Sequence, residues 1–249
     1  MESARLYRLL HRGSEGDASF YIDACRGAGS VLELGCGFGR LLAPLAQDGM
    51  QVTGVDRDEA MLKLAAETVA DLSPEDAGRV ALLEGDMTRF DAGKKFDRVL
   101  IPFNGLYCLS SDEAVLSCFK TAKAHLAENG RLLFDVYTVD PEDEPNPGEE
   151  DEDAVEYLTT ILDGDREIDV RERDVWDPQA STVEVTYLFT FREGGAARQV
   201  RQTIVHRYMT PETTLQLLDQ AGFRVMAKYG GFTREEPDRD SVHLIVEAG

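Results

Sequence analysis

Residues 32–40 read Leu-Glu-Leu-Gly-Cys-Gly-Phe-Gly-Arg, and this stretch decides the fold. The apolar run at 31–34 predicts a short strand, and a glycine then occupies every second position from Gly35 to Gly39. Glycine permits turns that other residues disfavour, and it lets the backbone approach a ligand closely because it has no Cβ atom. A strand that ends in such a turn predicts a nucleotide-like ligand at the strand end.

The spacing of these glycines departs from the dinucleotide-binding fingerprint Gly-x-Gly-x-x-Gly. A fingerprint that starts at Gly35 requires glycine at position 40, and one that starts at Gly37 requires it at position 42. The sequence has Arg40 and Leu42 at these positions. An NAD-dependent oxidoreductase is therefore kept only as an alternative.

Acidic residues follow the second and third predicted strands. Asp56 comes directly after the run 51–55, where a carboxylate meets ribose hydroxyls in nucleotide-binding α/β folds. Asp86 and Met87 follow the third strand, where an aspartate can accept a hydrogen bond from an adenine amino group while the methionine packs against the base. For Asp56 the alternative is a solvated side chain beside Arg57.

Short β-branched runs alternate with helical patterns from residue 31 to 136, which is typical of βαβ units and a parallel sheet. Ser110 and Glu113 form a capping box that predicts a helix start, and Asn129-Gly130 predicts its end. The motif Thr210-Pro211-Glu212 begins another helix. We expect a Rossmann-like, seven-stranded, mostly parallel sheet whose last strand is antiparallel, with helices on both faces. The predicted strands span residues 31–34, 51–55, 80–83, 96–101, 131–137, 223–228 and 241–246.

The sequence changes character between the two parts of this α/β core. Nine of the fourteen residues from 140 to 153 are acidic and prolines interrupt the rest, which predicts a solvated loop over 140–154. Apolar and polar residues then alternate in three runs, at 168–176, 183–191 and 204–208, which predicts an antiparallel β-meander inserted at 155–208. We expect the meander to cover the substrate or to form a homodimer surface. The core and its N-terminal lid then occupy 1–139, and 209–249 completes the core.

The composition excludes several classes of partner. The 249 residues hold 47 Asp and Glu against 26 Lys and Arg, a net charge of −21, and such a surface repels nucleic acids and anionic membranes. The four cysteines form no Cys-x-x-Cys pair, so we expect reduced thiols, no metal site and a cytoplasmic protein. No apolar stretch approaches the roughly 18 residues of a membrane span, and no targeting segment is recognisable.

Together these residues resemble the class I S-adenosylmethionine-dependent methyltransferases. The resemblance covers residues 17–137 and resumes at 207–223, with a tail pattern that looks like small-molecule methyltransferases. It implies that the run 33–39 holds the methionine part of S-adenosylmethionine, that Asp56 holds the ribose, and that Asp86 with Met87 holds the adenine. The stretch 98–104 is implied to face the sulfonium and the substrate. The candidate cofactor-binding residues are Tyr21, Glu33, Gly35, Cys36, Gly37, Gly39, Arg40, Asp56, Arg57, Met61, Asp86, Met87, Phe103 and Asn104.

The leader at 16–21, Gly-Asp-Ala-Ser-Phe-Tyr, is similar to an element that precedes the glycine motif in many bacterial members of this family. The similarity implies a lid in which Tyr21 packs on the cofactor, with Tyr7 as a second lid candidate. Ordinary helix packing by Phe20 and Tyr21 is the alternative.

Methyl transfer is an in-line displacement at a carbon that the sulfonium already activates, so the enzyme mainly aligns the nucleophile and excludes water. A base is needed only when the acceptor must lose a proton. His206 and Tyr107 are the catalytic candidates, and a packed, structural His206 is the alternative. The expected reaction is methyl transfer to a nitrogen or oxygen of a small molecule. A non-catalytic, cofactor-binding interaction module stays open as a further alternative.

Overall fold

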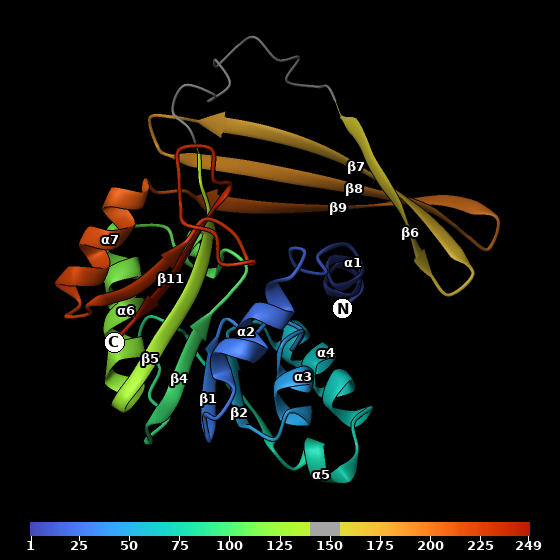
Figure 1. Ribbon diagram of the computed structural model, residues 1–249. Helices are drawn as coiled ribbons and strands as arrows, with labels where there is room; N and C mark the ends of the chain where they lie inside the picture. Colours follow the sequence, from blue (N-terminus) through green and yellow to red (C-terminus); the bar gives the residue numbers. More distant parts are fainter. Residues whose placement is uncertain (140–154) are drawn as a thin grey trace. The chain divides into compact units, whose positions relative to one another are not determined.

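The computed structural model describes residues 1–139 and 155–249, so the predicted acidic loop at 140–154 lies outside the described residues. The chain divides into two compact units, and Figure 1 labels most of their elements. Gly13–Thr138 with Met209–Gly249 is called the seven-stranded unit, and Met1–Arg12 with Val139–Tyr208 is called the four-stranded unit. The first twelve residues therefore belong to the same unit as the predicted meander.

The seven-stranded unit contains one mixed sheet with the strand order β10-β11-β5-β4-β1-β2-β3. Strands β1 to β5 run parallel to one another, and β11 runs antiparallel to both β5 and β10. This topology confirms the predicted seven-stranded sheet with an antiparallel last strand. The strands are β1 (Ser30–Leu34), β2 (Gln51–Asp56), β3 (Val80–Glu84), β4 (Phe96–Ile101), β5 (Leu126–Tyr137), β10 (Val225–Tyr229) and β11 (His243–Ala248).

Several helices of this unit begin at a polar side chain that caps the first turn. The Asp58 side chain accepts a hydrogen bond from the Ala60 N–H, and Thr210 caps the last helix in the same way through the Thr213 N–H. The expected cap at Ser110 is wrong: the adjacent Ser111 accepts from the Ala114 N–H, because Ser111 holds the extended backbone that a cap requires. The helices are α2 (Asp17–Cys25), α3 (Leu42–Gln47), α4 (Glu59–Ala70), α5 (Pro74–Ala77), the 3₁₀ turn η1 (Gly105–Cys108), α6 (Asp112–His125) and α7 (Pro211–Gln220).

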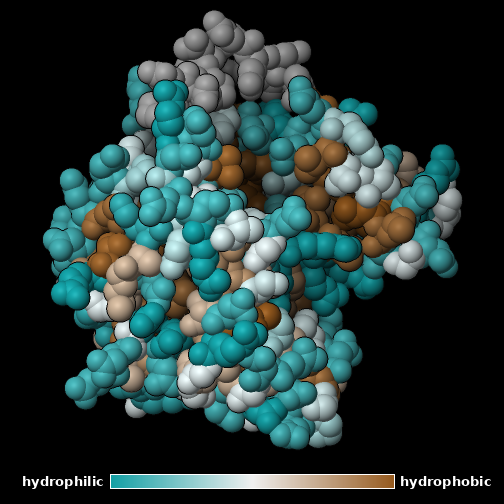
Figure 2. Space-filling view, viewed as in Figure 1, coloured by the Kyte–Doolittle hydropathy of each residue, from teal (hydrophilic) through white to brown (hydrophobic). Residues whose placement is uncertain are grey.

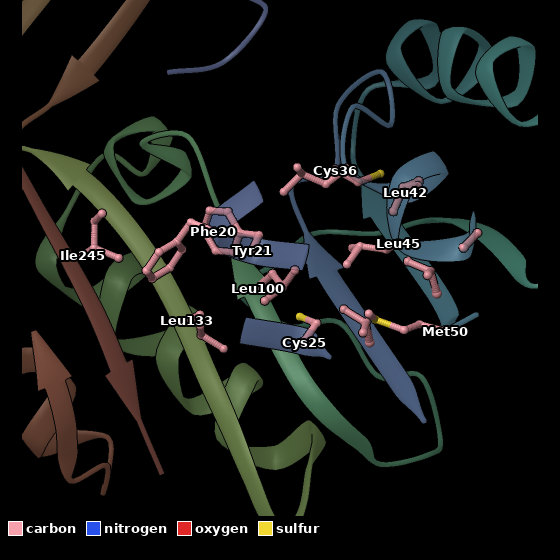
Figure 3. Packing of buried hydrophobic residues seen from close by; sticks show 14 residues of the cluster. Phe20, Tyr21, Cys25, Cys36, Leu42, Leu45, Met50, Leu100, Leu133 and Ile245 are labelled. Atoms are coloured by element: carbon pink, nitrogen blue, oxygen red, sulfur yellow. The ribbon is translucent and has the colours of Figure 1, made fainter. Parts of the chain in front are cut away.

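Helices cover both faces of the sheet because successive strand residues point to opposite sides. Leu133 of β5 belongs to a buried cluster with α2 and α3, and Figure 3 shows it with Phe20, Leu45 and Leu100. The next residue, Phe134, faces the other way, and its ring centroid lies 5.3 Å from that of Phe119 in α6. Burying apolar side chains on both faces contributes most of the stabilising free energy of such a sheet.

The transition from α6 to β5 differs from the expectation. The helix ends at His125 and the strand begins at once at Leu126, so Asn129-Gly130 lies inside the strand rather than at the helix end. The pairing of β4 with β5 shifts its register between Phe96 and Arg98. Asn129 has a positive φ of 63°, so the turn signal in the sequence corresponds to this irregularity in the strand.

The four-stranded unit holds an antiparallel sheet with the order β6-β7-β8-β9 and one helix. The predicted meander is therefore present, with one more strand, β6, than the three alternating runs of the sequence indicate. Its buried residues include Leu6 of the helix and Ile168, Phe189 and Phe191 of the sheet. The elements are α1 (Glu2–Leu10), β6 (Glu156–Asp163), β7 (Arg166–Asp177), β8 (Thr182–Glu193) and β9 (Ala196–Arg207).

Hydrophilic residues make up most of the face shown in Figure 2, as the charged composition leads one to expect. None of the helices in residues 1–139 and 155–249 is long and apolar enough to cross a membrane.

Candidate active site

The glycine turn lies at the carboxyl end of β1. Gly35, Gly37 and Gly39 have positive φ angles of 75°, 53° and 79°, a conformation that L side chains rarely adopt. The N–H groups of Gly35 and Cys36 both donate to the Val55 carbonyl at the end of β2, at 2.8 and 2.9 Å. A Cβ atom on Gly39 would lie 3.1 Å from the Ala65 Cβ. These positions therefore require glycine for the turn itself and for its close packing.

Asp56 closes the glycine turn from the neighbouring strand. Its Oδ2 atom accepts a hydrogen bond from the Gly37 N–H at 2.7 Å, and its Oδ1 atom accepts from the Asp58 N–H at 2.9 Å. Since each carboxylate oxygen has two lone pairs, both atoms keep capacity for a further donor such as a ribose hydroxyl.

The motif after β3 lies beside the same turn. A Cβ atom on Gly35 would lie 3.7 Å from the Met87 sulfur, so the structure brings these two candidates together. The Asp86 carboxylate accepts from the N–H and the hydroxyl of Thr88 at 2.9 and 2.7 Å, and these bonds hold its pKa below the usual range. Asp86 is therefore an ionised acceptor at neutral pH.

Glu33 is a buried acid directly before the glycine turn. Its side chain is only 3% exposed, and its Oε2 atom makes no hydrogen bond within residues 1–139 and 155–249. Burial raises the pKa of the Glu33 carboxyl to about 8; Arg40 opposes the rise, and Asp56 and Asp17 add to it. A buried polar atom without a partner is costly, so this carboxyl fits a cationic ligand group that supplies the missing donor.

Arg40 follows the glycine turn and joins it to two other elements. Its guanidinium makes two contacts with the Asp17 carboxylate of α2, at 2.7 and 2.8 Å. The same guanidinium carbon lies 5.4 Å from the centre of the Phe103 ring, a cation–π contact. The sequence analysis named Asp17 only as part of the motif at 16–21. Its contact with Arg40 makes Asp17 part of the site.

The turn after β4 is held by Asp135 of β5. Phe103 and Asn104 have positive φ angles of 54° and 58°. The Phe103 N–H donates to Asp135 Oδ1 at 2.8 Å, and the Asn104 N–H makes a longer contact of 3.4 Å with Oδ2. Sequence reasoning missed Asp135, whose signal is a single acid within the apolar run 132–136.

Tyr21 does not take the position expected of a lid. Its side chain has no exposed surface, and its hydroxyl donates to Asp135 Oδ1 at 2.6 Å. The protein covers the Tyr21 ring completely in this conformation, so the contact of Tyr21 with the cofactor stays a prediction. The alternative, helix packing of Phe20 and Tyr21, describes what the structure shows.

Comparison with known proteins identifies the family. Residues 31–130 match the family described as "Methyltransferase domain". Over 233 residues the chain is 30% identical to a protein of Geobacillus sp. (strain WCH70) that bears the name "Putative methyltransferase", covering 90% of this chain and 85% of that protein. The chain belongs to the class I S-adenosylmethionine-dependent methyltransferases. The alternative of an NAD-dependent oxidoreductase is wrong.

Solved structures agree with the fold of this methyltransferase. The CcbJ methyltransferase from Streptomyces caelestis is 25% identical, with a TM-score of 0.75 over 94% of this chain and 88% of that one. CalS10, an amino pentose methyltransferase from Micromonospora echinaspora solved with bound S-adenosylmethionine, is 21% identical, with a TM-score of 0.74 over 100% of this chain and 96% of that one. S-adenosylmethionine is the cofactor of the methyltransferase.

The two catalytic candidates of the methyltransferase have different surroundings. Tyr107 is buried, and its hydroxyl lies within hydrogen-bond distance of the carbonyls of Tyr137 and Met209, at 2.8 and 3.1 Å. Burial raises the pKa of Tyr107 above its usual value, which makes it a poor base at neutral pH. His206 lies in the four-stranded unit on β9, paired with Val183, and burial lowers its pKa. A catalytic role for either residue stays a prediction.

Two further candidate cofactor-binding residues are not fully buried. Arg57 is exposed after β2, and Met61 is half-buried in α4. Within residues 1–139 and 155–249, no group of three or more His, Cys, Asp and Glu side chains is placed to hold a metal ion.

Proposed function

We propose that this methyltransferase transfers the methyl group of S-adenosylmethionine to a nitrogen or oxygen atom of a small molecule by in-line displacement. The observation that supports the site most directly is the Glu33 carboxyl, buried beside the glycine turn with an Oε2 atom that no described residue bonds. The ammonium of the cofactor's methionine part is a donor of the kind that this carboxyl lacks.

The remaining candidates lie at neighbouring strand ends, and each suits a different part of the cofactor. The unused lone pairs of Asp56 suit the ribose hydroxyls, and the ionised Asp86 suits the adenine amino group while Met87 packs against the base. Bound S-adenosylmethionine supplies a methyl group that a positive sulfonium activates. The residues of the chain then orient the cofactor and exclude water.

The acceptor proposed here is an uncharged or cationic small molecule. The net charge of −21 disfavours phosphorylated acceptors, and CalS10 is described as acting on an amino pentose. Amines and hydroxyl compounds are therefore the first acceptors to test. A role of the four-stranded unit as substrate cover or dimer surface stays part of the proposal.

Calorimetry with S-adenosylhomocysteine and S-adenosylmethionine tests the cofactor site. Asp56→Ala should weaken binding about ten- to a hundredfold, because it removes an acceptor for buried ribose hydroxyls. Asp58→Ala is the matched control, since it removes a charge two residues away and leaves the hydrogen bonds of Asp56 with the Gly37 and Asp58 N–H groups in place. Equal loss in both variants, or no binding by the unmodified chain, would contradict the assignment of the site.

Release of S-adenosylhomocysteine from S-adenosylmethionine tests the reaction. The purified chain is incubated with primary amines, amino sugars, aliphatic alcohols and phenols, and turnover is expected with at least one nitrogen or oxygen class. Cofactor binding without turnover on any class would favour the interaction-module alternative instead.

A further inference from the structure

The turn at Phe103 and Asn104 is strained and therefore needs support. Two consecutive residues other than glycine have left-handed backbone angles, 54° and 58°, which persist only when the surroundings fix them. The Asp135 carboxylate accepts from the N–H groups of both residues, at 2.8 and 3.4 Å. The Asn104 side chain adds a third tie, because its Oδ1 atom accepts from the Tyr137 N–H at 2.7 Å.

Asp135 in turn depends on Tyr21. The Asp135 side chain is 1% exposed, and burial raises its pKa, while the hydrogen bond from Tyr21 is the largest effect that opposes the rise. Without the Tyr21 hydroxyl, the carboxylate loses its shortest donor at 2.6 Å and protonation becomes easier. A protonated carboxyl accepts hydrogen bonds less strongly, so the support of the turn weakens with it.

Helix α2 connects this turn to the glycine turn. Asp17 and Tyr21 are four residues apart on α2 and therefore share a face of the helix. Asp17 holds Arg40 directly after the glycine turn, and the Arg40 guanidinium lies over the Phe103 ring. The contacts thus form a closed ring: Arg40, Asp17, Tyr21, Asp135 and Phe103, with α2 as the link between its two sides.

We infer that Tyr21 and Asp135 are positioning residues of the cofactor site, which fix the turn at Phe103 and Asn104 against the glycine turn through helix α2. This inference rests on the proposed function. Stability alone does not call for such a network, since a well-packed apolar pair can replace buried polar partners without loss. A satisfied polar network holds one geometry, which a ligand site needs.

The test measures the dissociation constant of S-adenosylhomocysteine by calorimetry for three single variants and for the double variant of Tyr21 and Asp135. Tyr21→Phe removes only the hydroxyl, and Asp135→Asn removes one acceptor oxygen. The matched control is Asp97→Asn, because Asp97 also accepts from two backbone N–H groups, those of Gly29 and Ser30 at 2.8 and 2.9 Å, but at the opposite end of β1. Thermal unfolding of each variant is recorded, and binding is measured well below the unfolding temperature.

Tyr21→Phe and Asp135→Asn should each weaken binding about tenfold or more, a change of about 1.4 kcal/mol or more. The double variant should bind S-adenosylhomocysteine no more weakly than the weaker of the two single variants, because the two residues act as one unit. The amide proton signals of Phe103 and Asn104 should shift in both variants. The affinity of Asp97→Asn should stay within about twofold of that of the unmodified chain. This should hold even if the unfolding temperature of Asp97→Asn falls as much as that of the other two single variants.

The inference is overturned if Tyr21→Phe binds as tightly as the unmodified chain, or if Asp97→Asn loses as much affinity. Should Asp135→Asn fail to fold, Tyr21→Phe alone decides, and failure of Tyr21→Phe to fold would assign the hydroxyl to stability and refute a positioning role. An unmodified chain that binds neither S-adenosylhomocysteine nor S-adenosylmethionine defeats the proposed function itself, which is a distinguishable result.

Discussion

Glu33 shows how one residue can trade stability for binding. Its carboxyl lies in a strand whose neighbours Leu32 and Leu34 are fully buried, and burial raises its pKa from 4.5 to about 8. The folded protein therefore keeps a proton on Glu33 at neutral pH, whereas the unfolded chain does not. A cationic ligand reverses this preference, because it stabilises the ionised carboxylate.

The ionisation of Glu33 should make the free energy of unfolding depend on pH. Between pH 4.5 and about 8 the folded state binds one more proton than the unfolded state, so the free energy of unfolding should fall by about 1.4 kcal/mol for each pH unit from this group. Glu33→Gln lacks this contribution. Urea unfolding of both proteins at pH 5, 6, 7 and 8 should show the variant gaining relative to the unmodified chain as pH rises. Parallel curves would contradict the burial of an ionisable Glu33.

Cofactor binding should release a proton from the same carboxyl. At pH 7, below the pKa of about 8, the ammonium of S-adenosylhomocysteine should drive ionisation of Glu33 and release up to about one proton. Calorimetry at pH 7 in two buffers of different ionisation enthalpy measures this release. Glu33→Gln should bind more weakly and release less, and an equal release in the variant would remove Glu33 as the source.

Among the elements, α6 shows how a helix start is chosen between neighbouring residues of the same type. Ser110 and Ser111 offer the same hydroxyl, yet only Ser111 accepts from the Ala114 N–H, at 3.2 Å, and begins the helix. The sequence pattern favoured Ser110 because Glu113 stands three residues beyond it. Backbone conformation decides the matter, since Ser111 has the extended φ and ψ of −157° and 162°.

Alanine variants of these two serines give a matched pair. Ser111→Ala should lower the free energy of unfolding by about 1 kcal/mol, because the Ala114 N–H loses its acceptor. Ser110→Ala changes an exposed side chain and should stay within about 0.5 kcal/mol. Denaturant unfolding measures both, and a larger loss for Ser110→Ala would return the cap to the predicted position.

For the molecule as a whole, the main feature is the presence of two cores in one chain. One buried cluster includes Leu45, Leu100 and Leu133 of the seven-stranded unit, and another includes Leu6 and Phe189 of the four-stranded unit. All candidate cofactor-binding residues belong to the seven-stranded unit. Cofactor affinity should therefore depend on the first core far more than on the second.

Phe189→Ala tests this division. Removal of a fully buried ring should destabilise the four-stranded unit by about 3–5 kcal/mol, seen as faster hydrogen exchange in β7, β8 and β9. The affinity for S-adenosylhomocysteine should stay within about threefold. A large loss of affinity would show that the four-stranded unit takes part in holding the cofactor.

The sequence predicted most of the fold and the part of the site that rests on local patterns. Glycine spacing and the acids at 56 and 86 could be read directly, because each lies at a strand end. Strand β6 was missed because Tyr157, Leu158 and Leu162 are exposed on an outer strand, so its pattern lacks a buried apolar face. The end of α6 was misplaced because Asn129-Gly130 is an equally good turn signal inside an irregular strand.

Contacts between residues far apart in the chain could not be predicted from the sequence patterns. The bond between Tyr21 and Asp135 joins positions 114 apart, and no local periodicity reports such a pair. Tyr21 was singled out through its motif, but the sequence did not indicate Asp135 as its hydrogen-bond partner. Asp135 was visible only as a single acid in an apolar strand.

The ring from Arg40 to Phe103 through α2 constrains how this protein can be inherited or recombined. Its members come from four places in the chain, residues 17–21, Arg40, Phe103 and Asp135, and each contact is useful only when its partner is present. A chimera could take residues 13–25 from one homologous protein and β4 with β5 from another. The residues that meet at these contacts would then come from different proteins and need not fit one another. Viable hybrids should exchange residues 13–40 and 98–137 as one block.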